Sequence, residues 1–87
     1  MDNEQITRNY FHFVLRRFRH KAGLTQEQLA EKMGVSVGFL GMMEVGRRWP
    51  NIDMLFNIAR ALGVAPAELI DDLNREAQKG MPSAGRD

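Results

Sequence analysis

The chain has 87 residues, of which 44% are hydrophobic and 26% are charged, and it contains no cysteine. This length suits a single domain, close to the smallest size that folds without disulfides or bound metals. The lack of cysteine excludes a disulfide framework and a thiolate metal site, so the apolar core must provide the stability. No apolar run approaches the roughly 18 residues of a membrane span, and the start has no secretory signal. We therefore expect a soluble cytoplasmic protein without a membrane partner.

The net charge of +1 is unevenly distributed along the sequence. Residues 1–24 hold five Lys/Arg against two Asp/Glu, which gives +3, whereas residues 51–87 hold four against six, which gives −2. Residues 25–50 are balanced. A basic front and an acidic back would orient the molecule towards phosphates, and the alternative is an ordinary solvated surface.

The first predicted helix runs from about residue 6 to residue 22, after a polar segment, 1–5, that we expect to be flexible. Its support is a continuous apolar stripe at helical spacing, which comprises Phe11, Leu15, Phe18 and Ala22 and is widened by Val14. Tyr10 and Phe13 lie off the centre of this stripe, where they would cover a neighbouring element or form a subunit contact. Gly23 ends the helix.

Residues 26–45 are predicted to form two short helices joined by a tight turn. Thr25 and Gln28 have the spacing of a capping box at the start of the first helix. Gly34 can adopt the positive φ that the turn requires, and Ser36 is a good N-cap for the second helix, at about residues 36–45. The residues that point into one seam are Leu29, Met33, Val35, Leu40 and Met43. This pattern is typical of a helix-turn-helix, whose second helix enters a DNA major groove.

A fourth helix is expected over residues 52–62. Asn51 is its N-cap, and the N-terminus of the helix can also offer a phosphate site. Its apolar positions follow core periodicity and comprise Leu55, Ile58, Ala59 and Leu62, extended by Met54 and Phe56. Trp49, the only tryptophan, is expected to pack over the preceding loop and this helix.

A fifth helix begins near Pro66, which suits a first helical turn, and Leu69 is expected to fill the core. The sequence turns polar from residue 74, although the helix can continue to Lys79 before Gly80 ends it. We therefore divide the chain into a flexible N-terminus at 1–5, one domain at 6–73, and a helical extension with a polar tail at 74–87.

Several short motifs occur together in a fixed order. They comprise Arg19, Gly23-Leu24-Thr25-Gln26, Leu29-Ala30, Gly34-Val35-Ser36, Glu44, Gly46-Arg47-Arg48, Pro50 and the run from Ile58 to Val64. With these motifs, residues 16–73 resemble the Cro/lambda-repressor type of helix-turn-helix domain, in the xenobiotic-response-element family of transcriptional regulators. The resemblance covers about two thirds of the chain. It implies an all-α fold, a compact five-helix lambda-repressor-like DNA-binding domain whose second and third helices form the helix-turn-helix.

The resemblance also implies roles for individual side chains. It pairs Arg19 with Glu44, which would hold the first helix against the third. It places Gln26 against the DNA backbone, at a helix N-terminus whose N–H groups and dipole favour a phosphate. It places Arg47 and Arg48 at the phosphates that flank the groove. The alternative for each of these residues is a solvated side chain without a partner.

The third helix has an unusual set of groove-facing residues, which comprises Ser36, Val37, Gly38, Gly41 and Met42, with Phe39 at the edge. Only Ser36 can read base edges by hydrogen bonding, whereas Val37 and Met42 can contact only thymine methyls. The two glycines each cost up to ~1 kcal/mol in helix propensity relative to Ala. A close approach of DNA or of another helix is the physical candidate for offsetting this cost.

Two interpretations of this face remain open. In the first, the protein binds DNA through phosphates, methyl groups and DNA shape. In the second, an apolar patch formed by Val37, Phe39 and Met42 binds a protein partner.

The sequence contains no recognisable catalytic motif. His12 and His20 lie eight positions apart without a carboxylate placed to assist them, and we interpret them as surface or interface residues. The pair Asp71-Asp72 is interpreted as an acidic helix face, since it lacks the ligand spacing of a calcium loop. No phosphate-binding glycine loop or nucleophile motif is found. We expect no enzymatic activity, no cofactor, no metal site and no small-molecule substrate.

We therefore predict a DNA-binding transcriptional regulator of the repressor type, encoded by a bacterium or phage and associated with the nucleoid. Its predicted DNA-binding residues are Gln26, Ser36, Val37, Gly38, Met42, Arg47, Arg48 and Asn51. Ile70 and Leu73 are candidates for a homodimer contact that would place two reading helices on a two-fold-symmetric operator, the alternative being a monomer. The alternative function is a protein-interaction or antitoxin-like module that uses the apolar face of the third helix.

Overall fold

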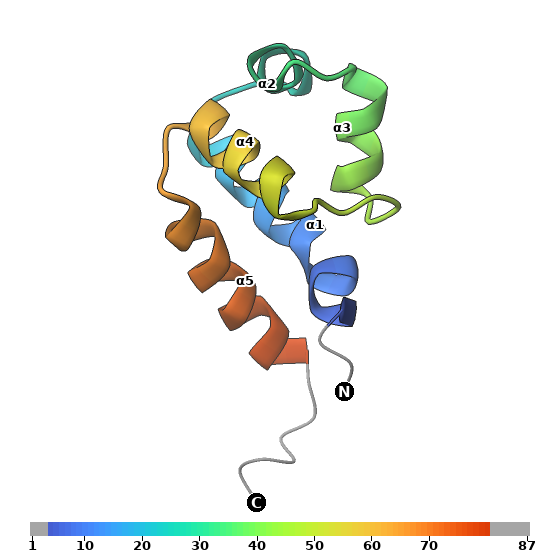
Figure 1. The fold of residues 1–87 in the computed structure, drawn as a ribbon, viewed down its shortest axis with the longest axis vertical. Coiled ribbons are helices and arrows are strands. Elements are labelled where there is room, and N and C mark those ends of the chain that lie inside the picture. Colours follow the sequence, from blue (N-terminus) through green and yellow to red (C-terminus); the bar gives the residue numbers. More distant parts are fainter. Residues whose placement is uncertain (1–3, 81–87) are drawn as a thin grey trace, which may run out of the picture.

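The computed structural model describes residues 4–80, and the segments 1–3 and 81–87, which include most of the expected flexible start and polar tail, lie outside that description. The described residues form five helices and no strand, as the all-α prediction requires (Figure 1). The helices are α1 (Glu4–Lys21), α2 (Gln26–Met33), α3 (Val37–Glu44), α4 (Ile52–Leu62) and α5 (Pro66–Gly80). Within residues 4–80, no helix is both long and apolar enough to cross a membrane.

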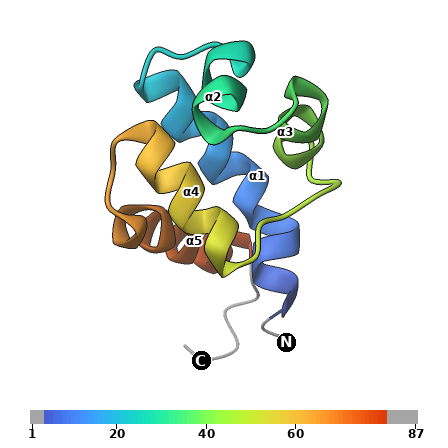
Figure 2. The same cartoon turned by 45° about the horizontal axis from the view of Figure 1, so that its top comes forward.

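The five helices form a connected set of packed pairs. The most extensive helix–helix packing is between α1 and α5, and α1 also packs against α3. α2 contacts both α3 and α4, and α4 contacts α5. Figures 1 and 2 both show α3 at the outer edge of the molecule, which leaves one of its sides free of other helices.

The core is formed by apolar residues from all five helices. Its largest fully buried side chains are Phe11, Val14, Leu15, Leu29, Leu40, Met43, Ile58 and Leu69. The expected stripe of α1 holds as far as Phe18, which packs against the core, but Ala22 is exposed. The reason is that α1 ends at Lys21, so Ala22 belongs to the following turn.

Side-chain caps define the start of the next three helices. Thr25 Oγ1 accepts a hydrogen bond from the Gln28 backbone N–H, and Gln28 Oε1 accepts one from the Thr25 N–H, which completes the expected capping box. Gly34 has a φ of 74° and ends α2. That left-handed conformation suits glycine and turns the chain directly into α3. The helix-turn-helix geometry therefore follows from local sequence.

The first helix starts earlier than expected, whereas the fifth ends within one residue of the expected Lys79. α1 begins at Glu4 instead of residue 6, and α5 continues to Gly80 with Ala77 buried. A Cβ on Gly80 would overlap the ring of Tyr10, so these two residues pack in direct contact. Through this contact, the helical extension expected from residue 74 packs against α1.

Candidate nucleic-acid interface

One side of α3 packs into the core and the other is exposed. Leu40 and Met43 are fully buried. Val37 and Met42, which the sequence placed in the groove, are 43% and 38% exposed. Phe39 is partly buried against the core, so it contributes less to the free face than an apolar patch of Val37, Phe39 and Met42 would require. The exposed side of α3 is accessible to a binding partner along its whole length.

The two glycines of α3 are not required by packing inside the described chain. A Cβ added to Gly41 would meet nothing within 4 Å. A Cβ on Gly38 would only touch Ser36 Oγ, at 4.0 Å. A close approach of another helix of this chain therefore does not explain them, within residues 4–80. They leave bare backbone on the free side of α3.

Ser36 is engaged as the N-cap of α3. Its Oγ accepts a hydrogen bond of 3.0 Å from the backbone N–H of Phe39. A serine hydroxyl has one donor as well as two acceptor lone pairs, so its O–H remains able to donate to DNA. The only polar side chain on this face thus combines a capping role with one free donor.

The C-terminal end of α3 is held by a buried carboxylate. Glu44 is only 2% exposed. Arg19 of α1 donates to both of its oxygens, from Nε to Oε2 at 2.6 Å and from Nη2 to Oε1 at 2.9 Å. Burial acts to raise the pKa of Glu44, but the hydrogen bonds from Arg19 and then Gln26 outweigh burial and lower the pKa. The pair that the resemblance implied is therefore present as a bidentate contact.

Gln26 has a hydrogen-bond partner inside the protein. Its Nε2 donates to Glu44 Oε1 at 3.0 Å, which makes it the third member of the Arg19–Glu44 network. Gln26 is half-buried at the first position of α2. The structure thus places its amide against α3, with its carbonyl oxygen and second N–H as the groups left for DNA.

The loop after α3 is fixed against α1 by a close contact. Gly46 has a φ of 84°, and a Cβ at this position would lie 3.1 Å from His12 Cδ2. His12 is therefore packed beneath the loop, and its Nδ1 is buried without a hydrogen-bond partner among the described residues. Burial, followed by the charge of Arg16, lowers the pKa of His12. His12 thus lies where α1 meets the loop, at a contact between segments that are distant in sequence.

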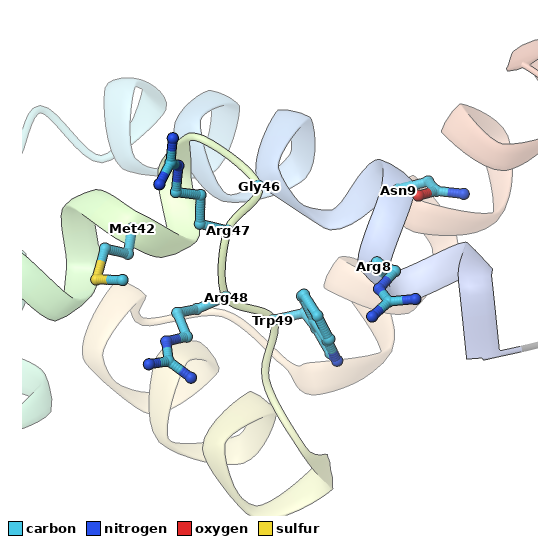
Figure 3. Close-up of a pocket in the computed structure, with 7 residues that line it drawn as sticks. All are labelled: Arg8, Asn9, Met42, Gly46, Arg47, Arg48 and Trp49. Carbon is cyan, nitrogen blue, oxygen red and sulfur yellow. The ribbon is translucent and has the colours of Figure 1, made fainter.

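Arg47 and Arg48 follow this fixed turn and are exposed. Their backbone N–H groups both donate to the Met42 carbonyl oxygen, at 2.9 and 3.2 Å. Neither guanidinium forms an ion pair with a carboxylate among the described side chains. Figure 3 shows both side chains between Met42 and Trp49. They are therefore available for phosphates.

Trp49 is partly exposed and contacts an arginine of α1. Its ring is 41% exposed, and the guanidinium carbon of Arg8, on α1, lies 4.6 Å from the ring centroid. One face of the indole is therefore covered by the Arg8 guanidinium of α1. Asn51 is the N-cap of α4, since its Oδ1 accepts from the Met54 N–H at 2.8 Å. Asn51 is exposed, and its side-chain amide N–H groups are directed to no described acceptor.

An ion-pair cluster between α1 and α5 was missed in the sequence. Arg17 donates to Asp72 from Nε at 2.9 Å and from Nη2 at 2.7 Å, and its Nη2 also reaches Glu76 at 2.9 Å. Asp72 is buried, so it does not belong to a solvated acidic face. Only the spacing of Asp72 and Glu76 on one side of a helix hinted at a shared partner.

The candidate dimer residues lie in different environments. Ile70 is 46% exposed, whereas Leu73 is partly buried against the core. Two further apolar residues, Ile52 and Phe56, are 60% and 56% exposed one turn apart on α4. The sequence analysis expects Phe56 to extend the core, and this prediction is wrong because its side chain is exposed. Ile52, Leu55 and Leu73 line one groove of about 130 Å³, together with residues of α1 and of the loop before α4.

The sequence matches a known protein family and a named relative. The family HTH_3, described as Helix-turn-helix, matches residues 15–69. A protein of Sinorhizobium fredii named as an uncharacterized HTH-type transcriptional regulator, y4dJ, is 43% identical over 54 residues, which are 62% of this chain and 70% of that protein.

Two solved structures share the fold. The clp gene regulator ClgR of Corynebacterium glutamicum superposes with a TM-score of 0.77 at 30% identity, over 83% of this chain and 77% of that one. The restriction-modification controller protein C.Esp1396I, solved as a tetramer in complex with its natural 35 base-pair operator, superposes with a TM-score of 0.74 at 25% identity. The match covers 88% of this chain and 99% of the controller protein.

Proposed function

The chain belongs to the HTH_3 helix-turn-helix family, and from this premise we propose that it represses transcription as a homodimer bound to a two-fold-symmetric operator. It is a DNA-binding regulator of transcription, like the regulators to which it is similar. The observation that carries the proposal is the free side of α3, bounded by two exposed arginines without carboxylate partners. Such a regulator would act in the cytoplasm, at the nucleoid of the bacterium or phage host.

The proposed mode of DNA binding relies on the backbone more than on base edges. Arg47 and Arg48 contact phosphates beside the groove, where guanidinium groups give strong charge-assisted hydrogen bonds. Gln26 and Asn51 add contacts near the N-termini of α2 and α4, where exposed N–H groups favour phosphate. These contacts fix the register of the protein on the duplex without carrying sequence information.

Sequence discrimination comes from the free side of α3. The Ser36 hydroxyl donates one hydrogen bond, and Val37 and Met42 contact thymine methyls. Gly38 and Gly41 let the helix backbone approach the floor of the groove closely, and sequence-dependent DNA shape contributes the remainder. Specificity obtained this way is modest for each half-site, so a second half-site is needed to select an operator.

The dimer contact is proposed on the exposed parts of α4 and α5. Ile52, Phe56 and Ile70 expose apolar surface there, and Leu73 lines a groove together with Ile52. Apolar residues clustered at a surface are typical of a protein contact. A two-fold contact would present two α3 helices to successive major-groove segments, roughly 34 Å apart. Occlusion of a promoter by such a dimer is the proposed mechanism of repression.

The experiment that tests this proposal is the salt dependence of DNA binding by Arg47→Ala/Arg48→Ala. Each phosphate contact contributes about 0.9 to the slope of log K against log salt concentration, so the double variant loses about two units per protomer. Arg60→Ala/Arg75→Ala is the matched control, because it removes the same charge from α4 and α5. An equal slope for wild type and the Arg47/Arg48 variant would refute the assigned phosphate contacts.

One observation favours a second candidate function. Val37 and Met42 expose apolar surface beside the uncovered backbone of Gly38 and Gly41, a combination that also suits a protein surface. In this case the chain would be a protein-interaction or antitoxin-like module. Absence of salt-sensitive DNA binding, together with loss of a partner on Met42→Glu, would favour it over the DNA proposal.

A further inference from the structure

Arg8 and Trp49 form a contact to which the proposed function assigns no role. Arg8 is exposed on α1, and its guanidinium carbon lies 4.6 Å from the centroid of the Trp49 ring. The ring itself is 41% exposed, although a tryptophan side chain usually buries most of its surface. The loop after α3 and the first half of α1 thus meet through a cation resting on an aromatic face.

This contact lies at one end of an open groove that begins at the reading helix. Met42, Arg47, Arg48, Trp49 and Arg8 line the groove together, and no acidic residue does. In Figure 3 the two arginines of the loop lie between Met42 and Trp49, and Arg8 lies beyond the tryptophan. The groove therefore continues from the free side of α3, past the loop, to α1.

The arginines of α1 are used in two different ways. The donors of Arg17 and Arg19 are directed to carboxylates, on α5 and α3 respectively. Arg8 forms no ion pair with a carboxylate among the described side chains. A guanidinium that rests on an aromatic face keeps the N–H donors at its edge available for an acceptor. Arg8 is thus held in place without its hydrogen-bonding capacity being consumed.

We propose that Arg8, positioned by Trp49, binds a backbone phosphate of the operator outside the groove segment that α3 enters. The proposal rests on the DNA-binding function proposed above and extends its footprint to α1. Three arginines that line one groove suit the repeated negative charge of a DNA strand, and a guanidinium matches the geometry of each phosphate. The contribution is independent of base sequence, since a phosphate contact carries no sequence information.

The test is the salt slope of binding by Arg8→Ala to a duplex about three helical turns long. The slope is expected to decrease by about one unit per protomer, with affinity reduced by a similar factor for all sequences. Arg8→Lys keeps the charge and is expected to retain most of the slope. Arg75→Ala, which removes one positive charge from α5, is expected to leave the slope unchanged. A slope for Arg8→Ala equal to that of wild type would overturn the proposal.

The positioning role of Trp49 is tested separately with Trp49→Leu and Trp49→Phe. Leu removes the aromatic face and is expected to lower the slope as Arg8→Ala does, whereas Phe is expected to restore it. In the Arg8→Ala background, Trp49→Leu should have no further effect on binding. An equal loss in both backgrounds would assign Trp49 a direct or merely structural role and would overturn the positioning role.

Shortening the duplex distinguishes a flanking contact from a general effect of charge. Removal of base pairs from the ends is expected to abolish the difference between wild type and Arg8→Ala before it affects Arg47→Ala/Arg48→Ala. Loss of slope on substituting Arg47 and Arg48 but not Arg8 would overturn this inference alone. Absence of DNA binding by the wild-type protein would overturn both this inference and the proposed function.

Discussion

Arg19 of α1 holds Glu44 at the last residue of α3, with Nε 2.6 Å from Oε2 and Nη2 2.9 Å from Oε1. The carboxylate is almost completely buried, and Gln26 of α2 donates to the same Oε1. Three helices therefore meet at one side chain. The orientation of the reading helix relative to the rest of the fold depends on this network.

Removing the cation from this network should destabilise the protein strongly. Arg19→Ala leaves a buried charge without its partner, and we expect the free energy of unfolding to fall by about 3–5 kcal/mol. Denaturation by urea measures the change. Arg75→Ala removes only an exposed, 3.4 Å partner of Asp72, which Arg17 still holds, and is expected to cost less than about 1 kcal/mol. Similar losses for the two variants would show that the network does not secure α3.

The same pair predicts a dependence of stability on pH. Because the pKa of folded Glu44 lies below its ordinary value of 4.5, unfolding favours proton uptake at this residue. The resulting stabilisation is present above pH 4.5 and is lost as the pH falls through the lower pKa of the folded state. Glu44→Gln cannot titrate, so its deficit in unfolding free energy relative to wild type should be constant near neutral pH and should shrink in acid. A deficit that persists unchanged in strong acid would contradict this account.

The glycines of α3 should separate stability from binding. Gly38→Ala and Gly41→Ala are expected to raise the free energy of unfolding by up to ~1 kcal/mol each, because the added methyl groups meet little or nothing and favour the helix. DNA affinity should fall, since the methyl groups hold the backbone away from the duplex. Gly34→Ala is the control, and it should destabilise the fold because the φ of Gly34 is 74°. Unchanged affinity in the α3 variants would exclude a close approach to DNA.

The local part of the fold could be predicted from the sequence because its signals are short-range. Thr25 and Gln28 specify a cap within four residues, and Gly34 specifies the turn by its own conformation. The contact between His12 and Gly46 could not be predicted, since neither residue is unusual in its own segment. Trp49 illustrates the same limit, because the partner of its exposed ring lies on α1, more than forty positions earlier.

The candidate site also contains residues that the sequence predicts correctly and residues that it does not. Helical periodicity identified Val37 and Met42 as the free side of α3, and their exposure agrees with this. Periodicity also placed Phe56 in the core, although it is exposed. A residue at the margin of an apolar stripe can face either the core or a second subunit, and the pattern of one chain is the same in both cases. The exposure of Phe56 can therefore be known only once the packing of the helices is known.

The dimer should respond to changes on α4 that leave the monomer intact. Ile52→Ser and Phe56→Ser replace exposed side chains, so we expect little change in the stability of the fold and a weaker self-association. Sedimentation equilibrium measures the dissociation constant of the dimer. Phe13→Ser removes another exposed aromatic residue, on α1, and should not affect association. Equal effects of the α1 and α4 variants would place the dimer contact elsewhere.

The central claim, that this chain recognises a two-fold-symmetric operator through α3, is tested most directly by selection of a random duplex library with the purified protein at moderate salt. The account predicts enrichment of a palindromic site whose half-sites are about one helical turn apart, with thymines at the positions that Val37 and Met42 reach. Salt-sensitive binding without any enriched sequence would contradict it, since α3 would then contribute no recognition of the operator.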